Sequence, residues 1–254
     1  MSDSSIAHRL INNPHGGRIY YQGPELSQGP LPAIIFFALS AKMSLFEDPF
    51  NQAVLHCAGH PIRIFSWDLP FHEDGIEPKE AMFKWMTEMK EDPHFIDRFL
   101  SQCDSHLSFL IQQNYITPDR IAVAGLSRGS YMATQVAAHD KRITTILGFA
   151  PLTQSVPYEN NEDPSIYEPL SLSHLAPLLI HKHLRFYIGN HDQRVGTDLC
   201  FEFIKTLTET AFQSGIRSPS VELIIYPSIG HKGHGTPPYV FEEGSNWLKK
   251  QLLN

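Results

Sequence analysis

The stretch Gly-Leu-Ser-Arg-Gly, residues 125–129, places one serine between two glycines. A serine hydroxyl is a poor nucleophile at neutral pH unless a base accepts its proton and N–H donors stabilise the oxyanion. The pattern Gly-x-Ser-x-Gly is typical of a sharp strand-to-helix turn that exposes the serine on a strained backbone. An apolar run at 120–125 leads into this turn and a small-residue segment follows it. We therefore predict that Ser127 is a nucleophile; the alternative is a βα loop that is only rich in turn-forming residues.

A nucleophilic serine needs a base, and the base needs a group that orients it. Asp192 follows the apolar run 184–189, where a strand would end. Active groups of open α/β sheets gather at the carboxyl ends of strands. Asp192 is therefore the candidate acid, with the N-cap of the next helix as its alternative role.

The candidate bases follow the apolar run 221–226, in the stretch Gly-His-Lys-Gly-His-Gly, which contains His231 and His234. A neutral imidazole with an ordinary pKa of about 6.5 accepts a serine proton at pH 7. Both histidines can equally be exposed loop residues, since the chain has 14 histidines. The chain order Ser, Asp, His carries more weight than any one of these residues.

Elements that would position these side chains are visible as apolar runs. Seven runs predict strands, at 17–22, 33–39, 62–67, 120–125, 143–149, 184–189 and 221–226. Most are continuously apolar, which is typical of parallel strands covered on both faces. Helical patterns occupy 77–90, 92–114, 130–140, 197–215 and 238–253. Alternating strands and helices predict an α/β fold with a mostly parallel sheet and helices on both faces.

One domain is expected over 1–254, with 42% hydrophobic and 19% charged residues. The segment 151–179 is rich in Pro, Asn and Ser and is long for a bare loop, which predicts a small cap-like insertion.

The net charge and the lack of targeting patterns limit the kinds of binding partner that we expect. The net charge is −7 and no lysine- or arginine-rich run occurs, so we expect no nucleic-acid partner. The chain start lacks the pattern of a secretory signal. The longest apolar stretch is about half of the roughly 20 residues that a membrane helix needs, so we expect no membrane partner. Three widely spaced cysteines fit a reducing cytoplasm. Paired histidines without a carboxylate or cysteine at ligand spacing predict no metal.

Four stretches resemble the α/β-hydrolase fold, and within it the branch of dienelactone-hydrolase and prolyl-oligopeptidase-like esterases. They are ITPDRIAVAGLSRGS at 116–130, SWDLPFHEDG at 66–75, YIGNHDQRV at 187–195 and YPSIGH at 226–231. The resemblance covers roughly residues 18–254 and implies that the insertion follows the sixth strand of that fold. Asp68 and His72 of the second stretch either line the site or structure their loop.

The resemblance implies a role for each site residue. It gives Ser127 as nucleophile, Asp192 as acid and His231 as base, four residues after Pro227 as in the family pattern. His234 is the alternative base, because loops of this kind tolerate insertions.

An oxyanion hole is implied by the same resemblance. The backbone N–H of Arg128 would be one donor. The second would come from the loop at 38–41, where the family has His-Gly before the donor and this chain has Ala-Leu-Ser-Ala. Ser40 aligns with that donor, and Leu39 is the alternative. The side chain of Arg128 would either bind a substrate carboxylate through its fork or pair with a neighbouring acid.

The function implied is that of a serine hydrolase without a cofactor. It would cleave a carboxylic ester of small or medium size through an acyl-enzyme intermediate. A peptidase or acyl-aminoacyl hydrolase using the same triad is one alternative. A non-catalytic binding protein that keeps the fold is another. The oligomeric state and the acyl length are not visible in the sequence.

Overall fold

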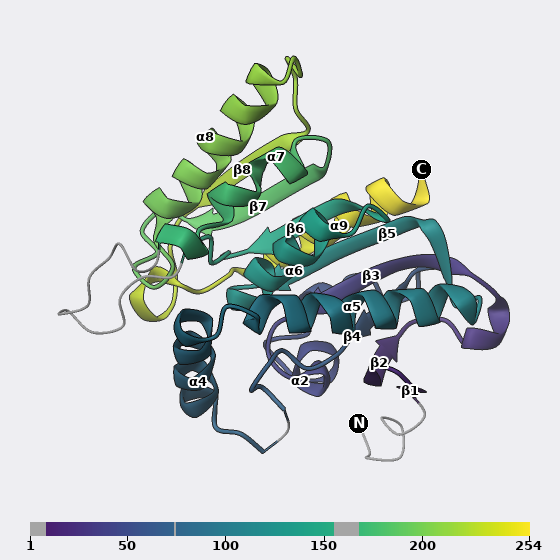
Figure 1. Ribbon diagram of the computed structural model, residues 1–254. Helices are drawn as coiled ribbons and strands as arrows, with labels where there is room; N and C mark the ends of the chain where they lie inside the picture. The colour runs from purple at the N-terminus through teal and green to yellow at the C-terminus, as the bar shows by residue number, and fades with distance from the viewer. Residues whose placement is uncertain (1–8, 74, 155–167) are drawn as a thin grey trace.

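The computed structural model describes residues 9–73, 75–154 and 168–254. Across these residues one sheet of eight strands runs through the molecule in the order β1-β2-β4-β3-β5-β6-β7-β8 (Figure 1). The strands are β1 Leu10–Asn13, β2 Gly17–Gln22, β3 Leu31–Phe37, β4 Arg63–Ser66, β5 Ile116–Leu126, β6 Ile143–Phe149, β7 His183–Gly189 and β8 Val221–Tyr226. Strands β3 to β8 pair in parallel, whereas β1 and β2 form an antiparallel edge.

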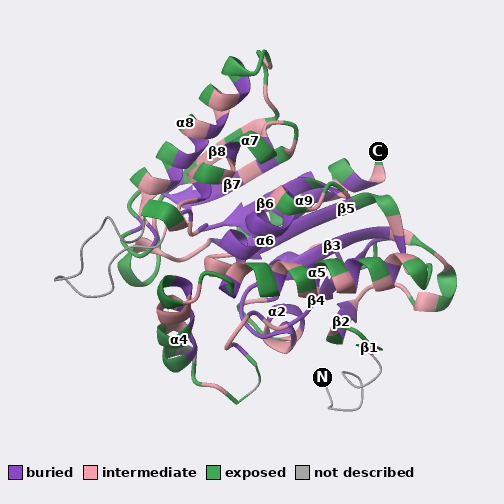
Figure 2. Cartoon of the chain, viewed as in Figure 1, coloured by how far each residue is buried: buried purple, intermediate pink, exposed green. Residues whose placement is uncertain are grey.

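The centre of the sheet is its most buried part. Strands β3 and β5 pair along their lengths, from Ala33 opposite Ile121 to Phe37 opposite Gly125. Every residue of 121–125 is buried (Figure 2). Continuous apolar runs are what a strand covered on both faces requires. The predicted α/β fold is confirmed, and the runs 17–22, 143–149 and 221–226 match their strands residue for residue.

Helices cover both faces of this sheet. The helices are α2 Ala41–Phe46, α3 Gln52–Leu55, α4 Pro78–Glu91, α5 Phe95–Gln112, α6 Arg128–His139, α7 Ala176–Leu179, α8 Thr197–Gln213 and α9 Pro238–Leu253, with short 3-10 turns η1 Leu26–Gln28, η3 Leu172–Leu175 and η4 His231–Gly233. One core lies between the sheet and helices α4 to α8, and a second lies between the sheet and α2, α3 and α9. In Figure 1 helices α5 and α6 lie in front of the sheet and α9 behind it.

The segment 151–179 is described only at its ends. Residues 155–167 lie outside the described part of the chain, so the cap-like insertion remains a prediction. The part that is described packs onto the front face, where Leu172 and Leu179 are buried. The Tyr131 hydroxyl of α6 donates a hydrogen bond of 3.0 Å to the carbonyl of Leu170. This contact ties the end of the segment to the helix that follows Ser127.

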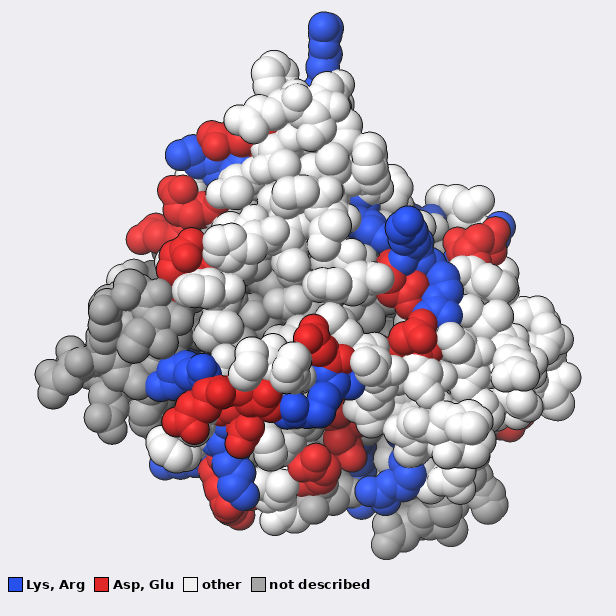
Figure 3. Space-filling view, in the orientation of Figure 1, with Lys and Arg blue, Asp and Glu red and all other residues white. Residues whose placement is uncertain are grey.

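Charged side chains are interspersed on the face shown in Figure 3, where blue and red atoms adjoin one another. Among the ion pairs of the described residues, the guanidinium of Arg142 pairs with Asp104 at 2.6 Å and with Asp140 at 2.5 Å. Cys57, Cys103 and Cys200 are buried free thiols. Among the described residues, no helix combines the length and the apolar character needed to cross a bilayer.

Candidate active site

The turn between β5 and α6 holds Ser127 in a backbone conformation that residues other than glycine rarely adopt. Its φ of 56° and ψ of −121° lie outside the regions favoured by L-residues. Such backbone strain costs roughly 1–3 kcal/mol and persists only where the surroundings impose it. Here the N–H of Ser127 donates to the carbonyl of Phe149 at 2.9 Å, and the carbonyl of Ser127 accepts from the N–H groups of Ser130 and Leu152. These bonds from both sides hold the strained turn in place.

The two glycines of the motif allow close packing. A Cβ on Gly125 would lie 2.3 Å from the carbonyl carbon of Gly129, and a Cβ on Gly129 would lie 2.0 Å from the carbonyl oxygen of Phe37. No side chain fits at either position. The next residue, Ser130, is small and buried, and its hydroxyl donates to the carbonyl of Gly125 at 2.6 Å. The serine thus adds a bond across the turn.

Asp192 lies in the loop after β7, where the sequence predicts the acid. Its side chain is fully buried. Oδ1 accepts the N–H groups of Arg194 at 2.9 Å and Val195 at 3.2 Å. Oδ2 faces the Nδ1 atom of His234 at 2.7 Å. Because each oxygen is engaged, the carboxylate has one orientation and points at one imidazole.

His234 completes a hydrogen-bonded chain of three side chains. Its Nδ1 faces Asp192, so this nitrogen carries the proton and donates it to the carboxylate. Its Nε2 is then an acceptor, and it lies 3.0 Å from the Oγ of Ser127. The imidazole is only 10% exposed. This arrangement can remove the proton from the serine hydroxyl and stabilise the imidazolium that results.

His231, which the family spacing favours as the base, does not take this position. It is exposed at the start of η4, and the structure places its alternative, His234, between Asp192 and Ser127. The preference for His231 is therefore wrong. The reason lies in how the loop closes: the N–H of Gly235 donates to the carbonyl of Ile229 at 2.8 Å. Residues 230–234 form the turn inside that closure, with His231 on its outer side.

Contacts with the loop of the acid direct His234 inward. The N–H of Gln193 donates to the carbonyl of Lys232 at 2.9 Å. Gly233 has a φ of +75°, and a Cβ there would lie 2.1 Å from the carbonyl oxygen of His191. The two loops therefore meet backbone against backbone. The sequence carries no local signal for this contact, since glycine also precedes His231, and counting from Pro227 favours the wrong histidine.

The oxyanion donors remain a prediction. Arg128 is the first residue of α6, and the first N–H groups of a helix have no acceptor within it. Leu39 lines the same cavity as Ser127, whereas the side chain of Ser40 caps α2 by accepting the N–H of Met43 at 3.1 Å. The N–H of Leu39 donates to Ser44 Oγ at 3.2 Å. Leu39 and Ser40 both remain candidates for the second donor, and the N–H of Leu39 would have to exchange this partner to act as one.

A cavity of about 450 Å³ opens beside Ser127 and His234. This volume lies in the usual range for small-molecule sites. Most of its wall is apolar, from Ala38, Leu39, Pro49, Phe50, Leu126, Ile229 and Phe241. Two arginines, Arg128 and Arg194, also line it.

Arg128, which lines this cavity, contacts the buried side chain of His72. The Nδ1 of His72 donates to the carbonyl of Pro70 at 2.7 Å, so its Nε2 accepts from Arg128 Nη1 at 2.8 Å. Burial, and then the charge of Arg128, lower the pKa of His72 to about 4. Burial, and then the charge of Arg194, lower the pKa of Arg128 to about 10. At neutral pH the histidine is therefore neutral and the arginine is charged.

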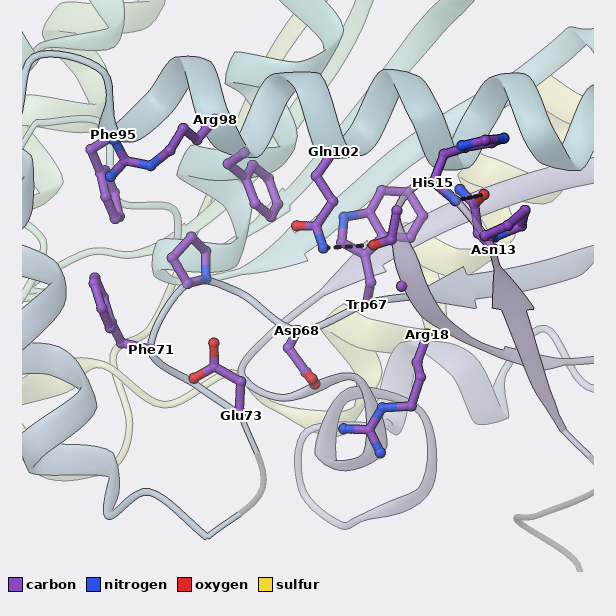
Figure 4. A pocket seen from close by; sticks show the side chains of 15 residues that line it. Asn13, His15, Arg18, Trp67, Asp68, Phe71, Glu73, Phe95, Arg98 and Gln102 are labelled. Carbon is purple, nitrogen blue, oxygen red and sulfur yellow. Dashed lines mark hydrogen bonds between the residues drawn. The ribbon is translucent and has the colours of Figure 1, made fainter.

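A larger cavity, of about 740 Å³, lies beside the loop after β4 (Figure 4). Trp67, Phe71 and Phe95 line it, with Glu73 and Asp68 at its polar side. Neither the serine nor the histidine of the hydrogen-bonded chain borders it. Asp68 Oδ1 accepts the N–H of Ala41, which anchors this loop to α2. Since Ser127 and His234 both line the smaller cavity, we place the candidate active site there.

Fold and site together define an α/β-hydrolase fold serine hydrolase: a mostly parallel sheet, a nucleophile elbow after a central strand, and an acid and a histidine in later loops. The family model described as the prolyl oligopeptidase family matches residues 97–254, well over half of the chain. The chain belongs to the prolyl oligopeptidase family. No curated protein matches it.

Solved structures of similar fold include esterases and peptidases. A cold-adapted esterase from an Arctic intertidal metagenomic library is 19% identical, with a TM-score of 0.62 over 96% of this chain and 92% of that chain. A protein of Klebsiella pneumoniae assigned as a dienelactone hydrolase is 13% identical, with a TM-score of 0.67 over 96% and 97%. A puromycin-hydrolyzing peptidase of Mycobacterium tuberculosis is 12% identical, with a TM-score of 0.65 over 99% and 41%. At these identities the likeness concerns the fold.

Proposed function

We propose that this protein is a carboxylesterase that hydrolyses esters of small or medium size through an acyl-enzyme at Ser127. One observation carries the proposal. The chain of hydrogen bonds from Asp192 through His234 to the Ser127 hydroxyl ends at a largely apolar cavity of about 450 Å³. An activated hydroxyl at the wall of such a cavity suits attack on a bound acyl group.

The mechanism follows from the positions of the atoms. Ser127 Oγ attacks the acyl carbon while His234 Nε2 takes its proton, and Asp192 stabilises the imidazolium. The N–H of Arg128, with that of Leu39 or Ser40, would donate to the oxyanion. His234 then protonates the departing alcohol, and water repeats the two steps to release the acid.

Peptide hydrolysis is the second candidate, favoured by the family to which the chain belongs. The same triad serves both reactions. The chain spans 41% of the puromycin-hydrolyzing peptidase that it resembles. Peptide p-nitroanilides tested beside p-nitrophenyl esters separate the candidates, since a peptidase turns over at least one peptide p-nitroanilide, whereas an esterase turns over the esters and none of the anilides.

The test of the proposal is active-site labelling with a fluorophosphonate, combined with a panel of p-nitrophenyl esters of increasing acyl length. We expect Ser127→Ala to abolish labelling and to lower ester turnover by roughly 10⁵- to 10⁶-fold. Ser218→Ala is the matched control, because Ser218 is exposed, precedes the start of β8 and is not among the residues that line the Ser127 cavity. Labelling that persists in Ser127→Ala, or no turnover of any ester by the unaltered protein, would contradict the proposal and favour a binding protein.

A further inference from the structure

Two arginine side chains at the wall of the Ser127 cavity have no acidic partner in the described part of the chain. Both Arg128 and Arg194 line this cavity. Among the described residues, no carboxylate lies within ion-pair distance of either guanidinium. This contrasts with Arg142 and Arg185, which pair with Asp104 and Glu222 at the surface. Of the two possibilities for Arg128 raised by the sequence, pairing with a neighbouring acid finds no support across residues 9–73, 75–154 and 168–254.

The hydrogen bond that the Arg128 side chain makes with His72 leaves its charge uncompensated. The Nη1 of Arg128 donates to the Nε2 of His72. The Nδ1 of the same imidazole carries the proton and donates it to the carbonyl of Pro70. The acceptor is therefore a neutral ring. A guanidinium has five N–H donors, and this contact uses one of them. A largely buried cation without a counter-charge is costly, so a group that supplies negative charge there gains more than it would at the surface.

The acid of the triad cannot supply that charge. Asp192 lies two residues before Arg194 in the loop, and its Oδ1 is taken by the backbone N–H groups of Arg194 and Val195. Its Oδ2 is taken by His234, and its side chain is fully buried. The described wall of the cavity thus carries two positive side chains and no carboxylate, although the whole chain has a net charge of −7.

We propose that Arg128 and Arg194 form an anion subsite that selects esters carrying an ionised carboxylate. The inference rests on the proposed esterase function and names the substrate class of the same site. A forked guanidinium matches the two oxygens of a carboxylate, which gives both direction and strength to the contact. Because Arg128 and Arg194 line the same cavity as Ser127, one small molecule can carry both the carboxylate and the cleaved ester. The apolar wall formed by residues such as Phe50 and Phe241 accommodates the carbon skeleton between them.

The experiment compares matched pairs of esters that differ in one charge. On the acyl side the pair is p-nitrophenyl hydrogen adipate and its methyl ester. On the leaving-group side the pair is 4-acetoxybenzoate and its methyl ester. For each pair the measured quantity is the ratio of kcat/KM for the charged ester to kcat/KM for the neutral one. We expect one pair to show a ratio well above one in the unaltered protein.

Substitutions then assign that preference to the arginines. Arg128→Met should lower the ratio by roughly tenfold to a hundredfold, as loss of a charge-assisted hydrogen bond in a buried setting does. Arg194→Met should lower it by about two- to fivefold, because this side chain is exposed. Arg128→Lys keeps the charge without the fork and should give an intermediate ratio. Arg217→Met is the control, since it removes the same charge from the connection between α8 and β8, outside the residues that line the cavity, and should leave the ratio unchanged.

Every outcome supports or overturns the anion subsite. A ratio near or below one for both pairs, or a ratio that neither Arg128→Met nor Arg194→Met changes, overturns it. Turnover of the neutral esters, together with fluorophosphonate labelling, shows that the esterase function stands. Failure of the anion subsite is thereby distinguished from failure of the proposed esterase function. If Arg128→Met does not fold, as judged by its melting temperature and labelling stoichiometry, the ratios of Arg128→Lys and Arg194→Met test the subsite in its place.

Discussion

The turn around Ser127 and the loop around His234 are both glycine-rich, yet they differ in what sets their geometry. In the turn, the glycines pack against β3 and α6, elements that adjoin it in the fold, and the spacing Gly-x-Ser-x-Gly already specifies the conformation. In the loop, Gly233 packs against the carbonyl oxygen of His191, which belongs to another loop. A motif can therefore be interpreted from sequence when its constraints come from its own strand–turn–helix unit and from the neighbouring strand of the same sheet.

The loop offers two histidines of equal chemistry, and only its docking distinguishes them. His231 is exposed, whereas His234 contacts Asp192 and Ser127. The loop length beyond Pro227 sets which histidine faces inward, and loops accept insertions readily. Counting residues along the chain is therefore unreliable for identifying the base in this loop, whereas residue spacing is reliable for identifying the serine in the turn.

The largest expected effect separates the two histidines. His234→Ala should lower kcat by roughly 10⁵- to 10⁶-fold, because the serine loses its base. His231→Ala is the matched variant and should change kcat by less than about twofold, since its side chain is exposed and outside the hydrogen-bonded chain. Steady-state kinetics with a p-nitrophenyl ester measures both. A large loss in His231→Ala with little loss in His234→Ala would reverse the assignment.

The next effect tests whether both regions depend on close backbone packing. Gly129→Ala and Gly233→Ala should each lower the free energy of unfolding by about 4 kcal/mol or more, because the new Cβ would overlap a backbone carbonyl. Gly215→Ala is the control: its φ of +87° resembles that of Gly233, but nothing lies within 4 Å of the added carbon. Its cost should be about 1 kcal/mol, from the backbone conformation alone.

Urea denaturation of the three glycine variants gives these free energies. Equal losses for Gly233→Ala and Gly215→Ala would mean that the loop does not press against the loop of the acid. Equal losses for Gly129→Ala and Gly215→Ala would mean that the turn around Ser127 does not depend on close packing of Gly129 against β3.

The smallest effect concerns His72, which touches the arginine of the turn. Its folded-state pKa of about 4 lies below the unfolded value of about 6.5, so between these pH values the unfolded chain binds a proton that the folded chain does not. Stability should therefore fall as pH drops from about 6.5 to about 4, and His72 contributes at most about 3 kcal/mol of this loss.

His72→Gln tests that contribution while keeping an acceptor for Arg128. Urea denaturation at several pH values should show a shallower decline for the variant across the window from about pH 6.5 to about pH 4. His106 is also buried, with a pKa lowered to about 4, and it contributes to the loss of stability at low pH equally in both proteins. Identical pH dependence with and without His72 would show that the buried ring does not carry this loss.

Most of the sheet was predictable from local pattern. Strand β6 matches its apolar run, because a strand buried between layers of helices must be apolar along most of its length. Strand β8 also matches its run, although it lies at the edge of the sheet and is only partly buried. The strand β1, Leu10–Asn13, was missed: it is short, half polar, and pairs only with β2 at the edge. The short helices α2 and α3 were missed for a similar reason, since a single turn or two of helix has little periodicity to detect.

Local pattern in the chain was enough to establish the α/β fold, the nucleophile elbow and the position of Asp192 after a strand, because these follow from burial, close glycine packing and the carboxyl edge of a parallel sheet. The folded arrangement was needed to show that His234 faces Asp192 and that Arg128 meets a neutral His72. Those pairings join segments 42 and 56 residues apart in the chain. Contacts between loops depend on how each one closes and docks, and no local spacing encodes that.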